Sequence, residues 1–207
     1  MTRLPIPGSR FPLSIGPWTV NSSREVYRNP WISVADYAVT RPDGAPGQYG
    51  VVSFANLAIG VLPLDDEGMT TLVGQHRFPH NAYSWELPEG GGKIGADPLQ
   101  SAKRELLEET GYRAAHWLEF ASFDVSNSVT DEKSVCFLAW GLTPGPAAPE
   151  PDEILAHRRL SFNALHEMVL KGDIRDSLTI IMTLKARAMA EAGTLPAEVA
   201  RLLLKAR

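Results

Sequence analysis

The 207-residue sequence has little of what marks several protein classes. It contains a single cysteine, Cys136, so no disulfide can form within the chain, and a reducing compartment fits that usage. No apolar run approaches the roughly 20 residues that a membrane-spanning helix needs. The start of the chain has no apolar signal-peptide core. We therefore expect a cytoplasmic protein without a disulfide scaffold.

The sequence also lacks an excess of basic residues. Its 20 Lys and Arg residues against 24 Asp and Glu residues give a net charge of −4. That balance provides no attraction for nucleic acid or for an anionic membrane surface. Hydrophobic residues make up 44% of the chain and charged residues 21%, which is ordinary for a globular protein with a buried core. We expect neither a nucleic-acid partner nor a membrane partner.

Strands and helices are mixed along the chain without strict alternation, which favours an α+β fold over a doubly wound sheet. Aromatic and β-branched runs between turn residues predict strands at 18–20, 26–27, 31–39, 49–55, 57–64, 70–76, 117–123, 135–140 and 154–160. Helical spacing of apolar residues predicts helices at 98–109, 162–170, 177–192 and 196–206. Residues 41–44 form a predicted turn, and residues 89–95 are a glycine-rich stretch that we expect to be a loop.

Three glutamates lie on one face of the predicted helix at 98–109. Glu105, Glu108 and Glu109 are spaced i, i+3 and i+4, and therefore fall within an arc of roughly 100°. They repel one another near the helix C-terminus, where the macrodipole disfavours negative charge. A hard divalent cation such as Mg²⁺ or Mn²⁺ would offset this repulsion, and a solvated acidic face is the alternative. The glycine-rich stretch favours the cation, because glycine lets backbone approach a metal or phosphate closely.

The same residues carry a resemblance to a known family. From Gly90 the sequence reads Gly, five residues, Ala96, seven residues, and then R-E-L-L-E-E-T-G-Y over residues 104–112. This resembles the Nudix box, G-x5-E-x7-R-E-U-x-E-E-x-G-U, in which U is a bulky apolar residue. Six invariant letters are in register, which is too many for a chance match in a chain of this length. The first Glu of the box is Ala96 here.

The flanking segments resemble the ADP-ribose and nucleoside-diphosphate-sugar pyrophosphatases of that family. Residues 72–79, L-V-G-Q-H-R-F-P, are similar to their strand ending in Q-Y-R-Y-P. Residues 85–90, W-E-L-P-E-G, are similar to their E-L-P-A-G run. Residues 126–132, S-N-S-V-T-D-E, are similar to a later loop that carries a catalytic carboxylate.

The resemblance implies a fold and an assembly. Residues 48–192 would form a Nudix hydrolase domain, an α/β/α sandwich around a mixed sheet. Residues 1–47 would form an N-terminal antiparallel β-sheet subdomain that serves dimerisation and substrate contact, and residues 193–207 would add a C-terminal helix. We accordingly expect a homodimer.

The resemblance also implies an activity. The protein would use Mg²⁺, replaceable by Mn²⁺, to hydrolyse the pyrophosphate bond of ADP-ribose or a related nucleoside-diphosphate sugar. The products would be a nucleoside monophosphate and a sugar phosphate. One alternative is another nucleoside diphosphate derivative, such as a dinucleoside polyphosphate, although the flanking segments argue against it. Another is a weakly catalytic ligand-binding or sensor protein, which Ala96 alone supports.

The metal ligands follow from the resemblance, residue by residue. Glu105 and Glu109 would bind the metal, and Glu108 would join when further ions bind. The backbone carbonyl of Glu89 would complete a site. Arg104 would tie the glycine-rich stretch to the helix.

Catalytic and substrate-binding roles follow in the same way. Glu132 is the expected general base, with Asp131 as its rival. Arg77 would bind the pyrophosphate beside Gly90, since a planar guanidinium suits paired contacts to phosphate oxygens. Glu86 would reach the metals or the substrate, unless it is a buried structural carboxylate.

An aromatic residue of the N-terminal sheet would stack on the nucleobase. Trp31 is the main candidate, with Tyr27 and Tyr37 beside it. The alternative for each is a place in the hydrophobic core.

Overall fold

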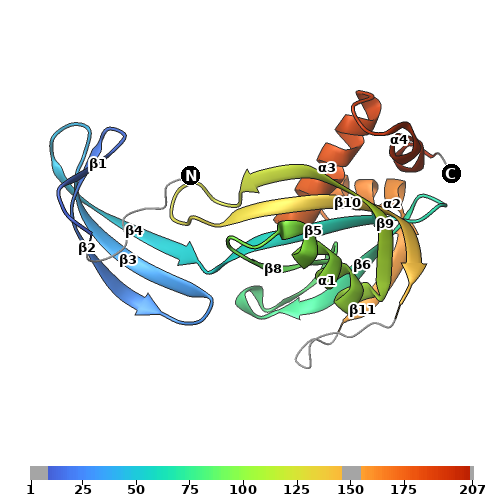
Figure 1. Ribbon diagram of the computed structural model, residues 1–207, viewed down its shortest axis with the longest axis horizontal. Coiled ribbons are helices and arrows are strands. Elements are labelled where there is room, and N and C mark those ends of the chain that lie inside the picture. Colours follow the sequence, from blue (N-terminus) through green and yellow to red (C-terminus); the bar gives the residue numbers. More distant parts are fainter. Residues whose placement is uncertain (1–8, 146–154, 206–207) are drawn as a thin grey trace. The chain divides into compact units, whose positions relative to one another are not determined.

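The computed structural model describes residues 9–145 and 155–205 (Figure 1). The chain divides into two compact units. Unit 1 holds Met1–Leu57 and Asp124–Lys133, and unit 2 holds Ala58–Phe123 and Ser134–Arg207. Across the described ranges, every helix falls short of what crossing a membrane would require in length or apolar character.

Unit 1 is built on an antiparallel sheet in the order β1-β2-β3-β4. Its strands are β1 (Leu13–Ile15), β2 (Trp18–Arg28), β3 (Ile32–Thr40) and β4 (Pro46–Phe54). The short strands predicted at 18–20 and 26–27 are parts of the one strand β2. Its polar middle keeps pairing with β3 through two register shifts, so the polar residues that suggested a break do not end the strand.

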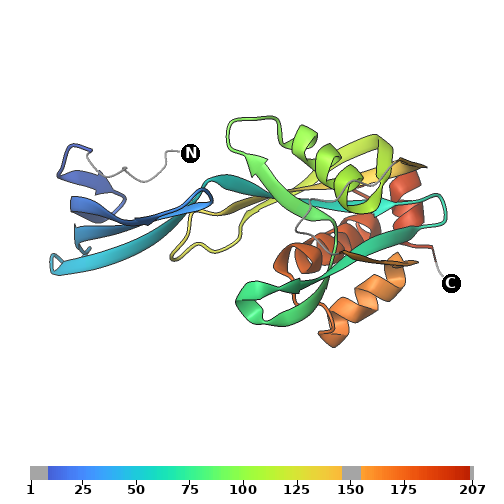
Figure 2. The same cartoon turned by 90° about the horizontal axis from the view of Figure 1, so that it is seen from below.

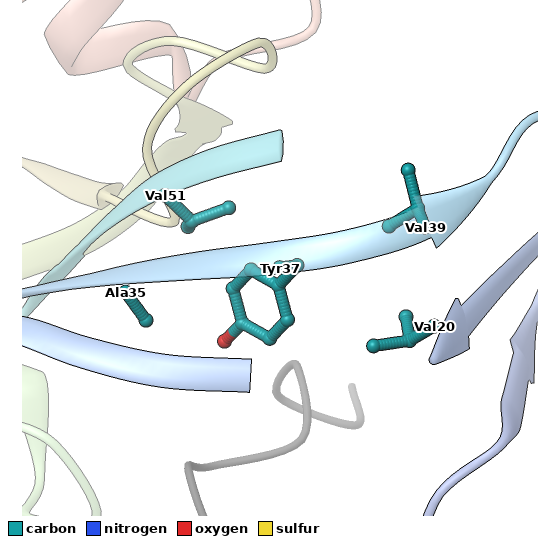
Figure 3. Packing of buried hydrophobic residues seen from close by; sticks show 5 residues of the cluster. All are labelled: Val20, Ala35, Tyr37, Val39 and Val51. Carbon is teal, nitrogen blue, oxygen red and sulfur yellow. The ribbon is translucent and has the colours of Figure 1, made fainter. Parts of the chain in front are cut away.

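One face of this sheet carries the hydrophobic core of unit 1. Figure 3 shows its members, Val20, Ala35, Tyr37, Val39 and Val51, gathered over strands β2, β3 and β4. Three of them alternate along β3, as the two-residue period of a strand with one buried face requires. The turn predicted at 41–44 joins β3 to β4, where the N–H of Gly44 donates to the carbonyl of Arg41 at 2.9 Å.

Unit 2 contains two sheets, ordered β8-β5-β10-β9 and β11-β6-β7. The first has β5 (Asn56–Leu64), β8 (Glu89–Lys93), β9 (Tyr112–Asp124) and β10 (Lys133–Pro144). The second has β6 (Met69–Arg77), β7 (Ala82–Glu86) and β11 (Ala156–Ser161). β5 and β10 run parallel, whereas β7 and β11 are antiparallel to β6, so the pairing in the unit is mixed.

Helices cover both sides of these strands. They are α1 (Pro98–Thr110), α2 (Phe162–Lys171), α3 (Ser177–Glu191) and α4 (Ala197–Leu203). Figure 2 shows α1, in yellow-green, on one side of the strands and α2 and α3, in orange and red, on the other. The expected α+β sandwich with mixed pairing is thereby confirmed. Residues 206 and 207 of the predicted C-terminal helix, and residue 154 of a predicted strand, lie outside the described residues.

The central strands of unit 2 are buried on both faces. In β5 the residues from Ile59 to Leu64 are all buried, which is expected of a strand with helices on both sides. The free thiol of Cys136, on β10, is fully buried as well. Burial raises the pKa of this thiol to about 11, so it is protonated and inert at neutral pH.

The glycine-rich stretch that we expected to be a loop is largely strand β8, which is the outermost strand beside β5. Glycine is required here by close packing rather than by a turn. A Cβ atom on Gly92 would lie 2.7 Å from Cγ1 of Ile59. The missing side chains therefore let β8 lie flat against the core and against α1.

Candidate active site

Helix α1 carries the predicted metal-binding glutamates, and both of its ends are capped. The carboxylate of Asp97 accepts from the N–H of Leu99 at 3.0 Å, and Pro98 occupies the first turn. Gly111 ends the helix with a φ of 71° in the left-handed region. The two caps fix where the helix begins and ends, and so which residues face the strands.

Two of the three glutamates on α1 are buried. Glu105 is 7% exposed and Glu109 is 2% exposed, and they share the buried face with Ala102 and Leu106. The alternative of a solvated acidic face is therefore wrong for these two residues. A carboxylate in such a place is costly unless hydrogen-bond donors or a cation compensate it. Glu108 is half-buried beside them.

The backbone of β8 lies directly against these carboxylates. The Oε2 atom of Glu109 accepts from the N–H of Glu89 at 2.9 Å. A Cβ atom on Gly90 would overlap the carboxylate of Glu105, so only glycine leaves that carboxylate its place. The carboxylates of Glu105 and Glu109 and the carbonyl of Glu89 are oxygen donors of the kind that Mg²⁺ prefers.

Arg104 lies between α1 and β8. Its Nη2 atom donates to the carbonyl of Gly91 at 2.8 Å and to Oε1 of Glu105 at 2.5 Å. Its Nη1 atom donates to Oε2 of Glu108 at 2.7 Å. One guanidinium thus holds the strand to the helix and offsets part of the negative charge of two glutamates.

Arg77, at the end of β6, is bound to two carboxylates. Its Nε atom donates to both carboxylate oxygens of Glu86 at 3.0 Å, and its Nη2 atom donates to Oε1 of Glu89 at 2.9 Å. Burial alone would lower the pKa of Arg77, but the hydrogen bonds and the charges of these glutamates raise it overall. The side chain of Glu86 is only 3% exposed, so this charge is offset inside the protein.

Asp176, which was not among the predicted site residues, joins this group from the N-cap of α3. One carboxylate oxygen from each of Glu86, Glu89 and Asp176 lies within 4.8 Å of the others, an arrangement that could hold a metal ion. Burial, followed by the charges of Asp176 and Glu86, raises the pKa of Glu89 well above its ordinary value. The aspartate before the predicted helix at 177–192 signals a cap, but no spacing in the sequence places it beside Glu86.

A cavity of about 470 Å³ opens beside this acidic group. Its volume falls in the range of small-molecule sites, and both guanidinium and carboxylate groups line it. The lining residues are Arg77, Pro79, His80, Ala82, Tyr83, Ser84, Glu86, Glu89, Asp173, Arg175, Asp176 and Ser177. Arg77, Glu86 and Glu89 therefore line one cavity.

The remaining predicted site residues belong to unit 1. Trp31 is 66% exposed and Tyr27 is 53% exposed, so both can meet a ligand. Tyr37 is only 5% exposed and belongs to the core of unit 1, which is the alternative that its sequence context left open.

The two rival bases on the segment 124–133 differ in their contacts. Oδ1 of Asp131 accepts from the N–H of Phe54 at 2.9 Å, and the N–H of Asp131 donates to the carbonyl of Val52 at 3.2 Å. Asp131 thus fastens its segment to β4. For Glu132, burial and then the charge of Asp131 raise the pKa of the carboxyl.

Two family profiles match this chain. The profile described as "NUDIX domain" matches residues 55–180. The profile described as "Nucleoside diphosphate sugar hydrolase N-terminal domain" matches residues 18–52. The two matches follow one another along the chain and together take in strands β2 and β3, most of β4, and helix α1 with its glutamates.

Curated relatives and a solved structure are similar over most of the chain. An "ADP-ribose pyrophosphatase" of Mycobacterium tuberculosis is 30% identical over 64% of this chain and 65% of its own length, just under two thirds of that relative. A "Methanol dehydrogenase activator" of Bacillus methanolicus is 30% identical over 69% of this chain and 78% of its own length. A solved "ADP compounds hydrolase" has the same fold, with a TM-score of 0.78 at 18% identity over 87% of this chain and 98% of that one. The first profile covers more than half of the chain and includes the buried glutamates of α1, so the chain belongs to the Nudix family.

Proposed function

We propose that the protein hydrolyses the pyrophosphate bond of ADP-ribose or a related nucleoside-diphosphate sugar in a reaction that depends on Mg²⁺. The observation that carries this proposal is the burial of the Glu105 and Glu109 carboxylates against the backbone of Glu89 and Gly90. The N-terminal profile and the name of the M. tuberculosis relative support the substrate class. ADP-ribose would yield AMP and ribose 5-phosphate.

The chain's own residues divide the work of binding and orientation. Glu105, Glu109 and the carbonyl of Glu89 would hold the cation, with Glu108 and the acidic group around Glu86 at hand for further ions. When bound, a divalent cation would supply charge neutralisation for the pyrophosphate and a lower pKa for the attacking water. Arg104 holds β8 to α1, which would keep the carbonyl of Glu89 and the carboxylates of Glu105 and Glu109 in fixed relative positions.

Glu132 is the general base in this proposal. It would accept a proton from water as the oxygen attacks one phosphorus atom and the bond from that phosphorus to the bridging oxygen breaks. Asp131 is already committed to the N–H of Phe54, which favours Glu132 for the role. The raised pKa of Glu132 makes it a better proton acceptor than an exposed glutamate.

Ala96, where the Nudix box has its first glutamate, does not favour the sensor alternative. The residue is exposed, in a turn closed by the hydrogen bond from its N–H to the carbonyl of Lys93 at 3.0 Å. The carboxylates that face β8 are intact without it.

The first test is hydrolysis by the purified protein. We expect release of nucleoside monophosphate from ADP-ribose or from another member of a nucleotide-sugar panel when Mg²⁺ is present. Chelation of the metal should abolish release. The substitution Glu109→Gln should reduce kcat at least about a hundredfold, because it removes one of the buried charges that would hold the metal.

Glu167→Gln is the matched control for this test. Glu167 is an exposed glutamate on α2 that forms a surface ion pair with Lys171, so its substitution should leave the rate unchanged. A protein that binds ADP-ribose with Mg²⁺ but leaves every member of the panel intact would contradict the proposed hydrolysis and favour a sensor.

A further inference from the structure

The segment from Leu87 to Glu89, between β7 and β8, is held at three successive backbone groups by three different elements. The N–H of Leu87 donates to Oγ1 of Thr179 on α3 at 2.8 Å. The carbonyl of Pro88 accepts from the N–H of Val61 on β5 at 2.8 Å. The N–H of Glu89 donates to Glu109 on α1. This segment carries the carbonyl expected to bind the metal, so its position matters for the site.

The contacts with Val61 and Thr179 both lie outside the Nudix box, and that with Thr179 is made by a side chain. Pro88 has no N–H, so Leu87 and Glu89 are the two amide donors of the segment, and a side chain accepts from each. Leu87 and Thr179 are both fully buried, so water cannot replace the hydroxyl as an acceptor. The loss of this acceptor would leave a buried amide without a partner.

The position of Thr179 is itself fixed by the acidic group. Its N–H donates to Oδ2 of Asp176 at 2.6 Å, in the N-cap of α3. The same Asp176 carboxylate lies beside those of Glu86 and Glu89. The start of α3 therefore contacts this part of the chain twice. The Thr179 hydroxyl accepts from the backbone of Leu87, and the Asp176 carboxylate lies beside the side chains of Glu86 and Glu89.

We propose that Thr179 is a positioning residue for the metal site, holding the Leu87–Glu89 backbone in the place where the carbonyl of Glu89 and the carboxylate of Glu109 can bind one ion. This inference rests on the proposed function. It gives α3 a role in metal affinity, although this helix lies far from the Nudix box in the sequence.

The same helix offers a matched control. Thr183 lies one turn after Thr179 and is also fully buried, but its hydroxyl has no hydrogen-bond partner among the described residues. Replacing either threonine by valine nearly keeps its shape and exchanges the hydroxyl for a methyl group. At Thr179 the change deprives Leu87 of its acceptor, whereas at Thr183 it takes no acceptor from a neighbouring group of the described chain.

The test compares Thr179→Val, Thr179→Ser and Thr183→Val in the full chain. Binding of Mn²⁺, followed by the electron paramagnetic resonance of the free ion without substrate, reports the site directly. We expect Thr179→Val to weaken Mn²⁺ binding about tenfold, the scale on which groups that orient metal ligands act. The Mg²⁺ concentration for half-maximal hydrolysis should rise in proportion. Thr179→Ser, which keeps the hydroxyl, and Thr183→Val should both bind Mn²⁺ like the wild type.

Thermal unfolding separates this role from a purely structural one. If Thr179→Val unfolds at a lower temperature but binds Mn²⁺ as the wild type does, the positioning role is overturned. It is overturned as well if Thr183→Val weakens Mn²⁺ binding equally. If the wild type binds Mn²⁺ but hydrolyses no nucleotide sugar, the proposed function fails, while the Mn²⁺ comparison still decides the role of Thr179.

Discussion

At the scale of single residues, Gly90 is the position where the smallest change should have a large effect. Its substitution by alanine would place a Cβ atom in the space of the Glu105 carboxylate, which would have to move. Because a shift of about 1 Å in a catalytic group can cost about a hundredfold in rate, we expect Gly90→Ala to lower kcat/KM by that order. Steady-state hydrolysis and Mn²⁺ binding would both measure the loss.

Gly50→Ala is the control for that substitution. Gly50 also lies in a strand, on β4, but the nearest atom to an added Cβ there is 3.8 Å away, an ordinary contact. This variant should keep wild-type kinetics. Equal rates for Gly90→Ala and the wild type would mean that the Glu105 carboxylate can move without consequence.

Some residues of the candidate site could be inferred from the sequence, and others could not. Glu105 and Glu109 could be named as candidates, because a local spacing places them on one helix face. Asp176 and Thr179 could not, because each acts on Glu86, Leu87 or Glu89 through a contact that only the folded chain creates. The position of Asp176 before a predicted helix indicates a cap, but no local pattern indicates its place beside Glu86 and Glu89.

At the scale of elements, the N-cap of α1 connects helix stability to the site. Asp97→Ala removes the acceptor for the N–H of Leu99, and we expect a loss of about 1 kcal/mol in the free energy of unfolding. Urea denaturation followed by circular dichroism would measure it. Asp97→Asn keeps an acceptor oxygen and should lose much less. An Asp97→Ala variant as stable as the wild type would show that the cap contributes nothing.

Elements with strong local signals could be predicted, and those without them could not. α1 has a capping aspartate, a proline and a terminating glycine, and its predicted range agrees with the structure within one residue. β8 has three glycines in five residues, a composition typical of loops. It is a strand because the absence of side chains allows close packing against Ile59 and Glu105, which is a tertiary cause.

At the scale of the whole molecule, the expected homodimer can be tested by mass. Unit 1 exposes several large apolar side chains, among them Val26, Tyr27 and Trp31, which is typical of a surface that meets a partner. We expect sedimentation equilibrium to give twice the 22.6 kDa of one chain. Trp31→Ser should raise the concentration at which the dimer dissociates.

Phe78→Ser is the comparison for the dimer experiment. Phe78 is 93% exposed but belongs to unit 2, so removing its ring tests whether any exposed aromatic has the same effect. A single-chain mass at all concentrations would contradict the expected dimer. An equal effect of both substitutions would remove the argument for unit 1.

The division of the chain into units depends on contacts that sequence patterns do not report. Residues 124–133 belong to unit 1 although the chain on either side of them belongs to unit 2. The contacts of Asp131 with Phe54 and Val52 show why, since they fasten this segment to β4. The motif in residues 126–132 could be recognised in the sequence, but its hydrogen bonding to β4 could not.

The burial of Cys136 has a practical consequence for labelling chemistry. The only thiol of the chain is fully buried and protonated at neutral pH, so maleimide and iodoacetamide reagents will leave the folded protein unmodified. A cysteine introduced at an exposed position such as Lys103, on α1, would then be the sole reactive site. A fluorophore or spin label could be attached there without first removing the native thiol.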